Sequence, residues 1–536
     1  MRKAHIGGCI LETQENESLG LRLLKKGQKG LVHAIFSRFG ILLLLLLLQV
    51  FILFVLFFRF QQFLPEYTGV TTIYSIIMVL YLINTDINPT AKTTWLIIIM
   101  AAPIVGSLLF VFTQREFGHK ALKLRLEQLI RDTHIAILQD ETVMEAVREK
   151  APEVAALNCY LNRSGCFPIY DQCEVKYFPS GESKFEELLI QLKEAEHFIF
   201  LEYFIIDEGV MWGKVLEILK EKAEAGVEVR VMYDGTCEFQ LLPHDYPKRL
   251  KKLGIKCKAF APVTPFVSTH YNYRDHRKIL VIDGHTAFTG GVNLADEYIN
   301  LVKRHGHWKD AALMIKGEAV KSFTLMFLQM WNVEEKQVEF YKYLGYISGQ
   351  NKKGKGYVMP YADEPLDDDK VGESVYIDIL NHAEKYVHIM SPYLILDGEM
   401  EHALKYAAKR GVEVKLILPG IPDKKAPYAL AKTHYKSLLE AGVKIYEYIP
   451  GFVHAKVFVS DNIKAVVGTI NLDYRSLYHH FECAAYLYEV ECIADIEKDF
   501  QDTLKQCKRI TLKEIKKTKI RYKLLGSIMK VVAPLL

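Results

Sequence analysis

The sequence lacks both a marked excess of charge and the cysteine spacing of a disulfide framework. Its 68 Lys and Arg residues nearly balance 64 Asp and Glu residues, so the net charge of +4 gives nucleic acid no general attraction. The nine cysteines are an odd, scattered set, which is typical of a reducing compartment. Cys159, Cys166 and Cys173 are evenly spaced, but zinc ligands usually come in closer CxxC-type pairs. We therefore interpret them as ordinary thiols and expect no bound metal.

Long uncharged runs mark the N-terminal region, after a polar and basic segment at residues 1–39. The uncharged run at 40–58 has the length of a bilayer core and is not followed by the small-residue cleavage site of a signal peptide. We predict a membrane anchor over residues 40–114, with two or three transmembrane helices at about 40–60, 67–84 and 95–113. Basic residues flank the anchor on both sides, which leaves the side of the N-terminus open and favours a cytoplasmic catalytic region.

The rest of the chain shows an internal duplication. Residues 115–165 have apolar residues at three-to-four spacing, which predicts a helical connector. Beyond it, the order helix, strand, helix, strand occurs twice, which predicts an α/β fold of two halves at 166–345 and 346–505, each a mixed β-sheet flanked by helices. A stretch rich in Lys, Gly and Asp at 351–372 is predicted to link the halves. We expect the basic amphipathic segment 506–536 to lie against anionic lipid headgroups.

One motif occurs once in each half, at residues 276–293 and 454–471. Each copy reads His-x-Lys, four residues, Asp, six residues, Gly, and then Asn three positions later. Residues two apart on a strand share a face, so the histidine and lysine of each copy point together. The pairs are His276 with Lys278 and His454 with Lys456. Two copies with the same internal spacing indicate a shared active site rather than chance.

The two copies, related by a pseudo-twofold axis, would form a single phosphate-handling site. The lysines would neutralise phosphate oxygens, and the side-chain amides of Asn293 and Asn471 would donate to the same oxygens. One imidazole can attack phosphorus while the other protonates the departing oxygen. The lysine charges replace those of a metal ion, so we expect no cofactor. Asp283 and Asp461 complete the candidate catalytic motif, but their odd spacing places them at a turn, where we interpret them as structural or lysine-holding residues.

Segments in and around the motifs carry a resemblance to a known family. They are NPTAKTTWLIIIMAAPIVG, NYRDHRKILVIDG, TGGVNLADEY, HWKDAAL, MSPYLI, LLEAGVKIYEY, PGFVHAKVFVSD and GTINLDYRS. Through them the chain resembles the phospholipase D superfamily and, within it, the bacterial cardiolipin synthases. The resemblance extends from the membrane segments to the C-terminus. It implies two phospholipase D-like halves behind a transmembrane anchor, in a multi-pass protein of the bacterial cell membrane.

The resemblance also implies a double displacement. The phosphatidyl group of one phosphatidylglycerol passes to a histidine, releasing glycerol, and then to a hydroxyl of a second phosphatidylglycerol. By the same resemblance His276 is the nucleophile, and His454 is the general acid and then the base. Glu482 is expected to orient His276, and Asp310 to orient His454, each from the opposite half. Thr469 stands where the family usually has Ser, and it keeps the hydroxyl.

Other functions remain as alternatives at this point. A phospholipase D-type hydrolase or a phosphatidylserine synthase would differ only in the hydroxyl that accepts the phosphatidyl group. A membrane-tethered nuclease would need a basic groove with stacking aromatics, for which Tyr271, Tyr273 and Arg274 are candidates, but the balanced charge argues against it. A scaffold with an inactive site conflicts with two complete motifs. We expect phosphatidylglycerol and anionic membrane lipids as partners and no nucleic acid; the oligomeric state is left open.

Overall fold

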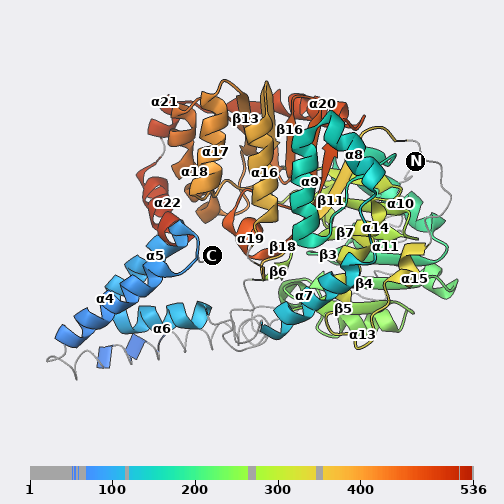
Figure 1. Ribbon diagram of the computed structural model, residues 1–536, viewed down its shortest axis with the longest axis horizontal. Coiled ribbons are helices and arrows are strands. Elements are labelled where there is room, and N and C mark those ends of the chain that lie inside the picture. Colours follow the sequence, from blue (N-terminus) through green and yellow to red (C-terminus); the bar gives the residue numbers. More distant parts are fainter. Residues whose placement is uncertain are drawn as a thin grey trace, which may run out of the picture.

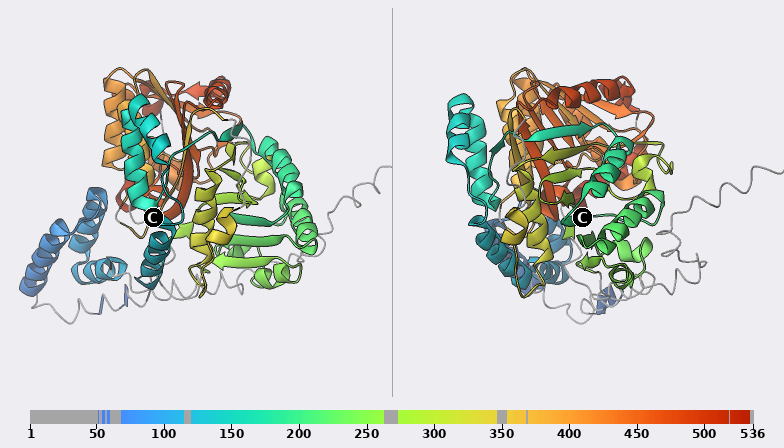
Figure 2. Two further views of the ribbon diagram at one scale, coloured as in Figure 1. Left: turned by 45° about the vertical axis from the view of Figure 1, so that its right-hand side comes forward. Right: turned by 90° about the vertical axis from the view of Figure 1, so that its right-hand side faces the viewer.

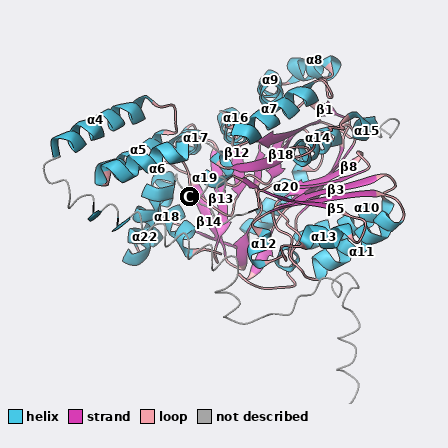
Figure 3. Ribbon diagram, turned by 90° about the horizontal axis from the view of Figure 1, so that it is seen from below, coloured by secondary structure: helices cyan, strands magenta, loops and turns pink. Residues whose placement is uncertain are grey.

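The two halves of the chain form two α/β layers that pack side by side. The computed structural model describes residues 51, 54–55, 58–59, 68–114, 120–262, 273–345, 354–367, 369–517 and 519–533. Figure 1 shows the first half in green and the second in orange and red, with three blue helices projecting from the second half. The views in Figure 2 show the same arrangement. Seen from below, the strands lie in the middle of the molecule and the helices surround them (Figure 3).

The first half contains a seven-stranded mixed sheet, in the order β2-β10-β8-β7-β3-β4-β5. Its strands are β2 (Glu174–Phe178), β3 (Phe198–Tyr203), β4 (Glu228–Asp234), β5 (Lys256–Phe260), β7 (Lys278–Ile282), β8 (Thr286–Gly290) and β10 (Ala312–Lys316). Its helices include α10 (Gly181–Glu194), α11 (Val210–Glu224), α13 (Tyr246–Lys251) and α14 (Val320–Trp331). Alternate residues of β3 enter different cores: Ile199 and Leu201 pack with α10 and α11, whereas Phe198 and Phe200 pack with α14.

The second half repeats this strand order as β11-β18-β17-β16-β12-β13-β14, with β1 and β19 added at the ends. The strands are β1 (Tyr170–Asp171), β11 (Tyr357–Asp363), β12 (Tyr386–Met390), β13 (Glu413–Pro419), β14 (Lys444–Tyr448), β16 (Val457–Ser460), β17 (Lys464–Gly468), β18 (His480–Tyr488) and β19 (Cys507–Arg509). The helices include α16 (Val371–His382), α17 (Gly398–Lys409), α18 (Lys425–Glu440), α19 (Tyr474–Tyr478) and α20 (Ile493–Leu504). The predicted mixed sheets with flanking helices are thus present in both halves.

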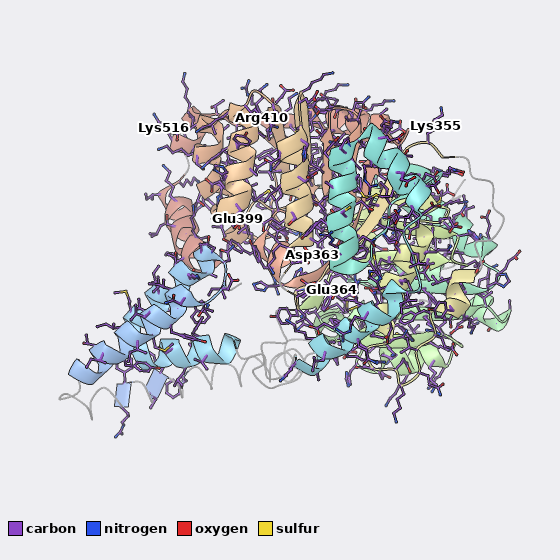
Figure 4. All side chains as sticks on the ribbon, viewed as in Figure 1. Lys355, Asp363, Glu364, Glu399, Arg410 and Lys516 are labelled. Carbon is purple, nitrogen blue, oxygen red and sulfur yellow. The ribbon has the colours of Figure 1, made fainter. Side chains whose placement is uncertain are left out.

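The predicted linker at 351–372 is wrong for its central part, because that part is strand β11. All seven of its residues pair with β18, from Tyr357 opposite Tyr488 to Asp363 opposite Glu482, and β11 also pairs with β1. Figure 4 places Asp363 and Glu364 near the junction of the two halves. The short apolar run of β11 lies between polar flanks, so composition averaged over the segment concealed the strand.

The predicted anchor differs from the structure at its third span. The segment 95–113 is two helices, α5 (Pro89–Ala101) and α6 (Pro103–Gln114), because Pro103 has no N–H to continue the first. The second span, 67–84, corresponds to α4 (Thr68–Asn84). Residues 1–39 and most of 40–60 lie outside the described residues. Within the described part of the chain, no helix has both the length and the apolar composition to cross a membrane.

Three connector helices and two C-terminal helices complete the structure. They are α7 (Lys120–His134), α8 (Glu141–Lys150), α9 (Pro152–Gly165), α21 (Leu512–Lys516) and α22 (Ile520–Val532). Helix α22 packs against α18 and also meets α5, where the Thr94 hydroxyl donates to the Val531 carbonyl at 2.5 Å. The chain beyond residue 505 is therefore partly docked between the second half and the projecting helices. All eight cysteines in the described residues are free thiols.

The motif aspartates cap the start of a central strand in each half. Asp283 accepts the backbone N–H groups of Glu196, His197 and Phe198 at 2.7–2.8 Å, just before β3. Asp461 does the same for three residues at the start of β12, at 2.8 Å. Both adopt positive φ at the turn. These contacts fit the structural interpretation, and they place neither aspartate among the groups that reach the histidines.

We predict that Asp283→Ala lowers the free energy of unfolding by about 2–4 kcal/mol, because it leaves three partly buried N–H groups without an acceptor. Chemical denaturation measures this loss. Turnover per folded molecule should change little. The control, Asp245→Ala, removes a half-exposed ion pair with Arg249 and should cost less than about 1 kcal/mol. Loss of turnover with unchanged stability would instead make Asp283 a catalytic carboxylate.

Candidate active site

Strand β6 (Arg274–Asp275) carries His276 across to the second half of the molecule. It pairs in parallel with His480 and Phe481 at the start of β18. The His276 N–H then donates to the Phe481 carbonyl at 2.9 Å. This register sets His276 beside the next residue of β18, Glu482, and its Nδ1 lies 2.8 and 2.9 Å from the two carboxylate oxygens.

A second crossing brings His454 to the first half in the same way. Strand β15 (Gly451–Val453) pairs in parallel with β9 (His307–Lys309). The His454 N–H donates to the Lys309 carbonyl at 2.7 Å, and His454 Nδ1 lies 2.8 Å from Oδ2 of Asp310. Each histidine is thus held by a carboxylate of the opposite half, which is the pairing that the resemblance implied.

The motif lysines lie directly beside the histidines. Lys278 Nζ donates to the His276 carbonyl at 2.5 Å, and Lys456 Nζ donates to the His454 carbonyl at the same distance. Lys456 Nζ also lies 2.9 and 3.0 Å from the two ring nitrogens of His454. Both lysines are buried, at 1% exposure. Both ammonium groups are therefore poorly hydrated, which strengthens their electrostatic effect on the neighbouring histidines.

Burial shifts the protonation of this cluster. It lowers the pKa of His454 to about 4, with help from Lys456, and it lowers the pKa of His276 well below its ordinary value, with help from Lys278. Burial also lowers the pKa of Lys278 to about 8 and that of Lys456 to about 7. Near neutral pH the imidazoles are therefore uncharged, as a nucleophile requires.

A cavity of about 680 Å³ is lined by both histidines and both motif asparagines. The amides of the two asparagines differ in their contacts. Asn293 accepts from the Ile205 N–H at 3.0 Å and donates to the Tyr298 hydroxyl at 2.7 Å, so one of its donors is already used. Asn471 Oδ1 is buried and has no hydrogen-bond partner among the described residues. The donation of both amides to phosphate remains a prediction.

The structure adds His480 to the site. Its ring centre lies 5.3 Å from that of His276, and its Nδ1 lies 3.5 Å from Oε1 of Glu482. Burial lowers the pKa of His480 to about 3, so the ring is neutral. His276, His480 and Glu482 are close enough for two imidazoles and a carboxylate to share a metal ion. His480 could have been found from the sequence, because it lies two residues before Glu482 on one strand and therefore shares a face of the sheet with it.

The two copies of the motif differ beside the carboxylates. The Thr469 hydroxyl donates to Glu482 and accepts the Cys483 N–H at 2.9 Å. The matching residue of the first copy is Gly291, and a Cβ there would stand 2.0 Å from Oδ1 of Asp310. Only the carboxylate that holds His276 therefore has a hydroxyl donor from this position, whereas close packing against Asp310 requires glycine.

The residues proposed for a nuclease groove do not form one in the described part of the site. Arg274 is buried, donates to the Ala261 carbonyl at 2.9 Å and lies 3.6 Å from the Asp234 carboxylate. Tyr273 is half-buried, and Tyr271 lies outside the described residues. The guanidinium of Arg274 is thus already neutralised from within the protein.

Comparison with known proteins identifies the family. The domain family described as "Cardiolipin synthase, PLD-like domain" matches residues 188–331 and 376–504, which include both motifs. The chain belongs to this family. A cardiolipin synthase of Alkalihalophilus pseudofirmus is 33% identical over 84% of the chain and 90% of its own length. One of Geobacillus kaustophilus is 32% identical over 86% of the chain and 92% of its own length.

A relative from Streptococcus mutans, described only as an uncharacterized protein, is 57% identical over 85% of the chain and 99% of its own length. Among solved structures, phosphatidylserine synthase of Haemophilus influenzae is similar with a TM-score of 0.56 and 14% identity, covering 71% of the chain and 99% of that protein. At this identity the likeness shows a shared fold. As a member of the cardiolipin synthase family, the chain is an enzyme of the phosphatidyltransferase class.

We predict that Thr469→Val, which keeps the volume but removes the donor to Glu482, lowers kcat about tenfold to a hundredfold. Thr469→Ser keeps the hydroxyl and should retain kcat within about threefold. Steady-state kinetics of both variants, with thermal unfolding as a check on folding, measures the effect. Equal losses in the two variants would assign Thr469 to packing rather than to hydrogen bonding.

We predict that kcat/KM falls as pH rises above about 7. The pKa values of about 7 for Lys456 and about 8 for Lys278 mean that both ammonium groups lose their protons there, which removes the positive charge that binds the anionic substrate. The pH profile of kcat/KM between about pH 5 and 10, about two pH units on either side of these values, measures this. A profile that stays flat to the alkaline end would show that the lysines remain charged.

Proposed function

We propose that the protein is a cardiolipin synthase that transfers a phosphatidyl group from one phosphatidylglycerol to another through a phosphohistidine. The observation that carries the proposal is that each motif histidine has its Nδ1 on a carboxylate of the opposite half, with both rings lining one cavity. Names of relatives that are about one-third identical over most of the chain support the same reaction.

In the first step, Nε2 of His276 attacks phosphorus. Glu482 holds Nδ1, so the lone pair on Nε2 is directed away from the carboxylate and is free to form the P–N bond. The P–O bond to glycerol breaks as His454 delivers a proton to the leaving oxygen. Burial and the field of Lys456 hold the pKa of His454 low in the free protein. The phosphodiester anion raises this pKa on binding, so that His454 takes up the proton from solvent before it delivers it.

In the second step, the hydroxyl of another phosphatidylglycerol attacks the phosphohistidine. His454, now neutral, accepts the hydroxyl proton while the P–N bond breaks, which frees His276 and leaves His454 protonated for the next cycle. Asp310 stabilises the imidazolium that forms at each turn of the cycle. The two lysines oppose the charge on the non-bridging phosphate oxygens throughout.

Transfer rather than hydrolysis requires a lipid hydroxyl to reach the phosphohistidine ahead of water. Aromatic side chains form part of the cavity lining, among them Phe204, Trp308, Tyr393 and Phe452. Exclusion of water from such a site, and a high local concentration of acceptor lipid at a membrane surface, both favour transfer. We therefore place the enzyme at the bacterial membrane, with phosphatidylglycerol as donor and acceptor.

The test is the lipid product formed by the purified protein from phosphatidylglycerol vesicles. We expect cardiolipin and glycerol. Phosphatidic acid with no cardiolipin would indicate a hydrolase, and phosphatidylserine formed only when serine is added would indicate the serine transferase. Either result would overturn the proposal.

We predict that His276→Ala lowers turnover by at least about 10⁴-fold and abolishes covalent labelling by phosphatidylglycerol that carries a radioactive phosphate. His454→Ala should still show slow labelling but fail to release it. The control is His285→Ala, at the turn between β7 and β8, where Nδ1 contacts the Thr286 hydroxyl away from the cavity. Labelled protein in His276→Ala, with none in His454→Ala, would reverse the two roles.

A further inference from the structure

Beside its catalytic groups, the active-site cavity has an apolar wall that the proposed chemistry does not use. We propose that this wall, formed by α18, α19 and α22, binds an acyl chain of the phospholipid substrate and opens toward the surface formed by α4, α5 and α22. The inference rests on a phospholipid substrate, and so deepens the proposed function. Its residues are Ile395, Leu430, Tyr474, Met529 and Ala533, which we call the apolar arm.

The apolar arm is continuous with the catalytic cavity. Its five residues line the same space as His276 and His454. Leu430, Tyr474 and Ala533 form a buried cluster of their own, against which Ile395 and Met529 pack. In Figure 1, α22 lies to the left of α19, and β6, which leads into His276, lies below and to the right of α19, so the arm and the histidine come from different elements of the cavity lining. A substrate with a phosphodiester and a long hydrocarbon chain matches this division.

The outer face of α22 is apolar as well. Ile520, Leu524, Ile528 and Val531 recur at helical spacing, and each is exposed, from 37% to 79%. Helix α4 is similar, with six large apolar side chains exposed over its length: Ile73, Ile76, Ile77, Leu80, Tyr81 and Ile83. Exposed apolar surfaces of this extent mark sites of lipid or protein contact. The apolar arm lies behind α22, on the face turned toward α18.

The positive charges around this surface favour a lipid bilayer as the source of the chain. Lys519, Arg521 and Lys523 are exposed at the start of α22, beside its apolar stripe. Figure 4 shows Lys516, on the neighbouring α21, at the outer edge of the second half. Basic residues next to an apolar helix face attract anionic headgroups while the apolar side chains enter the acyl region.

The geometry fixes α22 in this position. A Cβ on Gly526 would stand 2.5 Å from the Ala429 carbonyl, so α22 and α18 approach as closely as glycine permits. On the other side, Thr94 of α5 bonds to the Val531 carbonyl. Asn88, the N-cap of α5, donates to Asp397 at 3.1 Å and to the Tyr478 hydroxyl at 2.9 Å. The helix that walls the arm is thus tied both to the catalytic half and to the projecting helices.

Met529→Trp tests the apolar arm, because the larger ring fills space that the chain would occupy. The measurement is kcat/KM for phosphatidylglycerol with two 18-carbon chains and with two 6-carbon chains. We expect the long-to-short ratio to fall about tenfold or more, since each excluded CH₂ forfeits part of its burial. The control is Ser527→Trp, on an exposed position of the same helix, which should leave the ratio unchanged. An unchanged ratio in Met529→Trp would overturn the proposal.

Photo-crosslinking tests the same inference without turnover. Phosphatidylglycerol with a diazirine at the end of one acyl chain is bound to the protein and irradiated, and the labelled peptides are mapped by mass spectrometry. We expect label on residues 425–440 and 520–533, reduced about fivefold or more in Met529→Trp but not in Ser527→Trp. Label confined to other parts of the chain would overturn the inference. Crosslinking requires only that the lipid binds. If the protein makes no cardiolipin but these peptides are labelled, the proposed reaction is wrong and the apolar arm as an acyl-chain site is still supported.

Discussion

The active site depends on two backbone crossings between the halves. Where β6 runs beside β18, His276 meets Glu482, 206 residues away in the chain, and where β15 runs beside β9, His454 meets Asp310. Each crossing is fixed by main-chain hydrogen bonds, so the register, and with it the choice of carboxylate, does not depend on flexible side chains. Neither half contains a complete histidine–carboxylate pair. The proposed catalysis therefore requires both halves, because the histidine–carboxylate pairs form only at the interface between them.

Burial determines how the groups of this interface behave. His276, Lys278, His454, Lys456 and both carboxylates are each less than 9% exposed. Loss of water keeps the imidazoles neutral and weakens the hold of the lysines on their protons. Asp310 and Glu482 oppose this effect on both lysines, because their negative charges favour the protonated amines.

The interface has further support away from the histidines. Lys309, one residue before Asp310, forms an ion pair with Asp499 of α20, to which Tyr177 of β2 also donates at 2.7 Å. The second half, which supplies Asp499, also bears α22, and α22 contacts α5. The second half thus positions the projecting helices. Asn88 bonds to Asp397, and Thr94 bonds to Val531 of α22, the helix that contributes to the apolar wall of the cavity. The histidine cluster and the apolar wall of the cavity are therefore held in a fixed relative position.

The sequence by itself determined whatever depends on local periodicity. The alternation of side chains along a strand predicted that His276 and Lys278 share a face and that Asp283 lies at a turn. The repeated order of helices and strands predicted two related mixed sheets. The break between α5 and α6 at Pro103 is local in origin as well, because proline has no N–H to continue a helix. Amino-acid composition did not predict strand β11. This strand is stabilised by pairing with β18, which lies far along the chain, and not by a local sequence pattern.

Only the tertiary structure decided which distant groups meet. Nothing in the residues around Glu482 distinguishes it from a carboxylate on a solvated strand, and the resemblance alone suggested its partner. The pairing of β6 with β18 places His276 next to Glu482. It also places His480, which no sequence motif had indicated, in the same site. The reason is physical. Side-chain direction follows from the backbone conformation of a few residues, whereas contact across 206 positions follows from the packing of the whole chain.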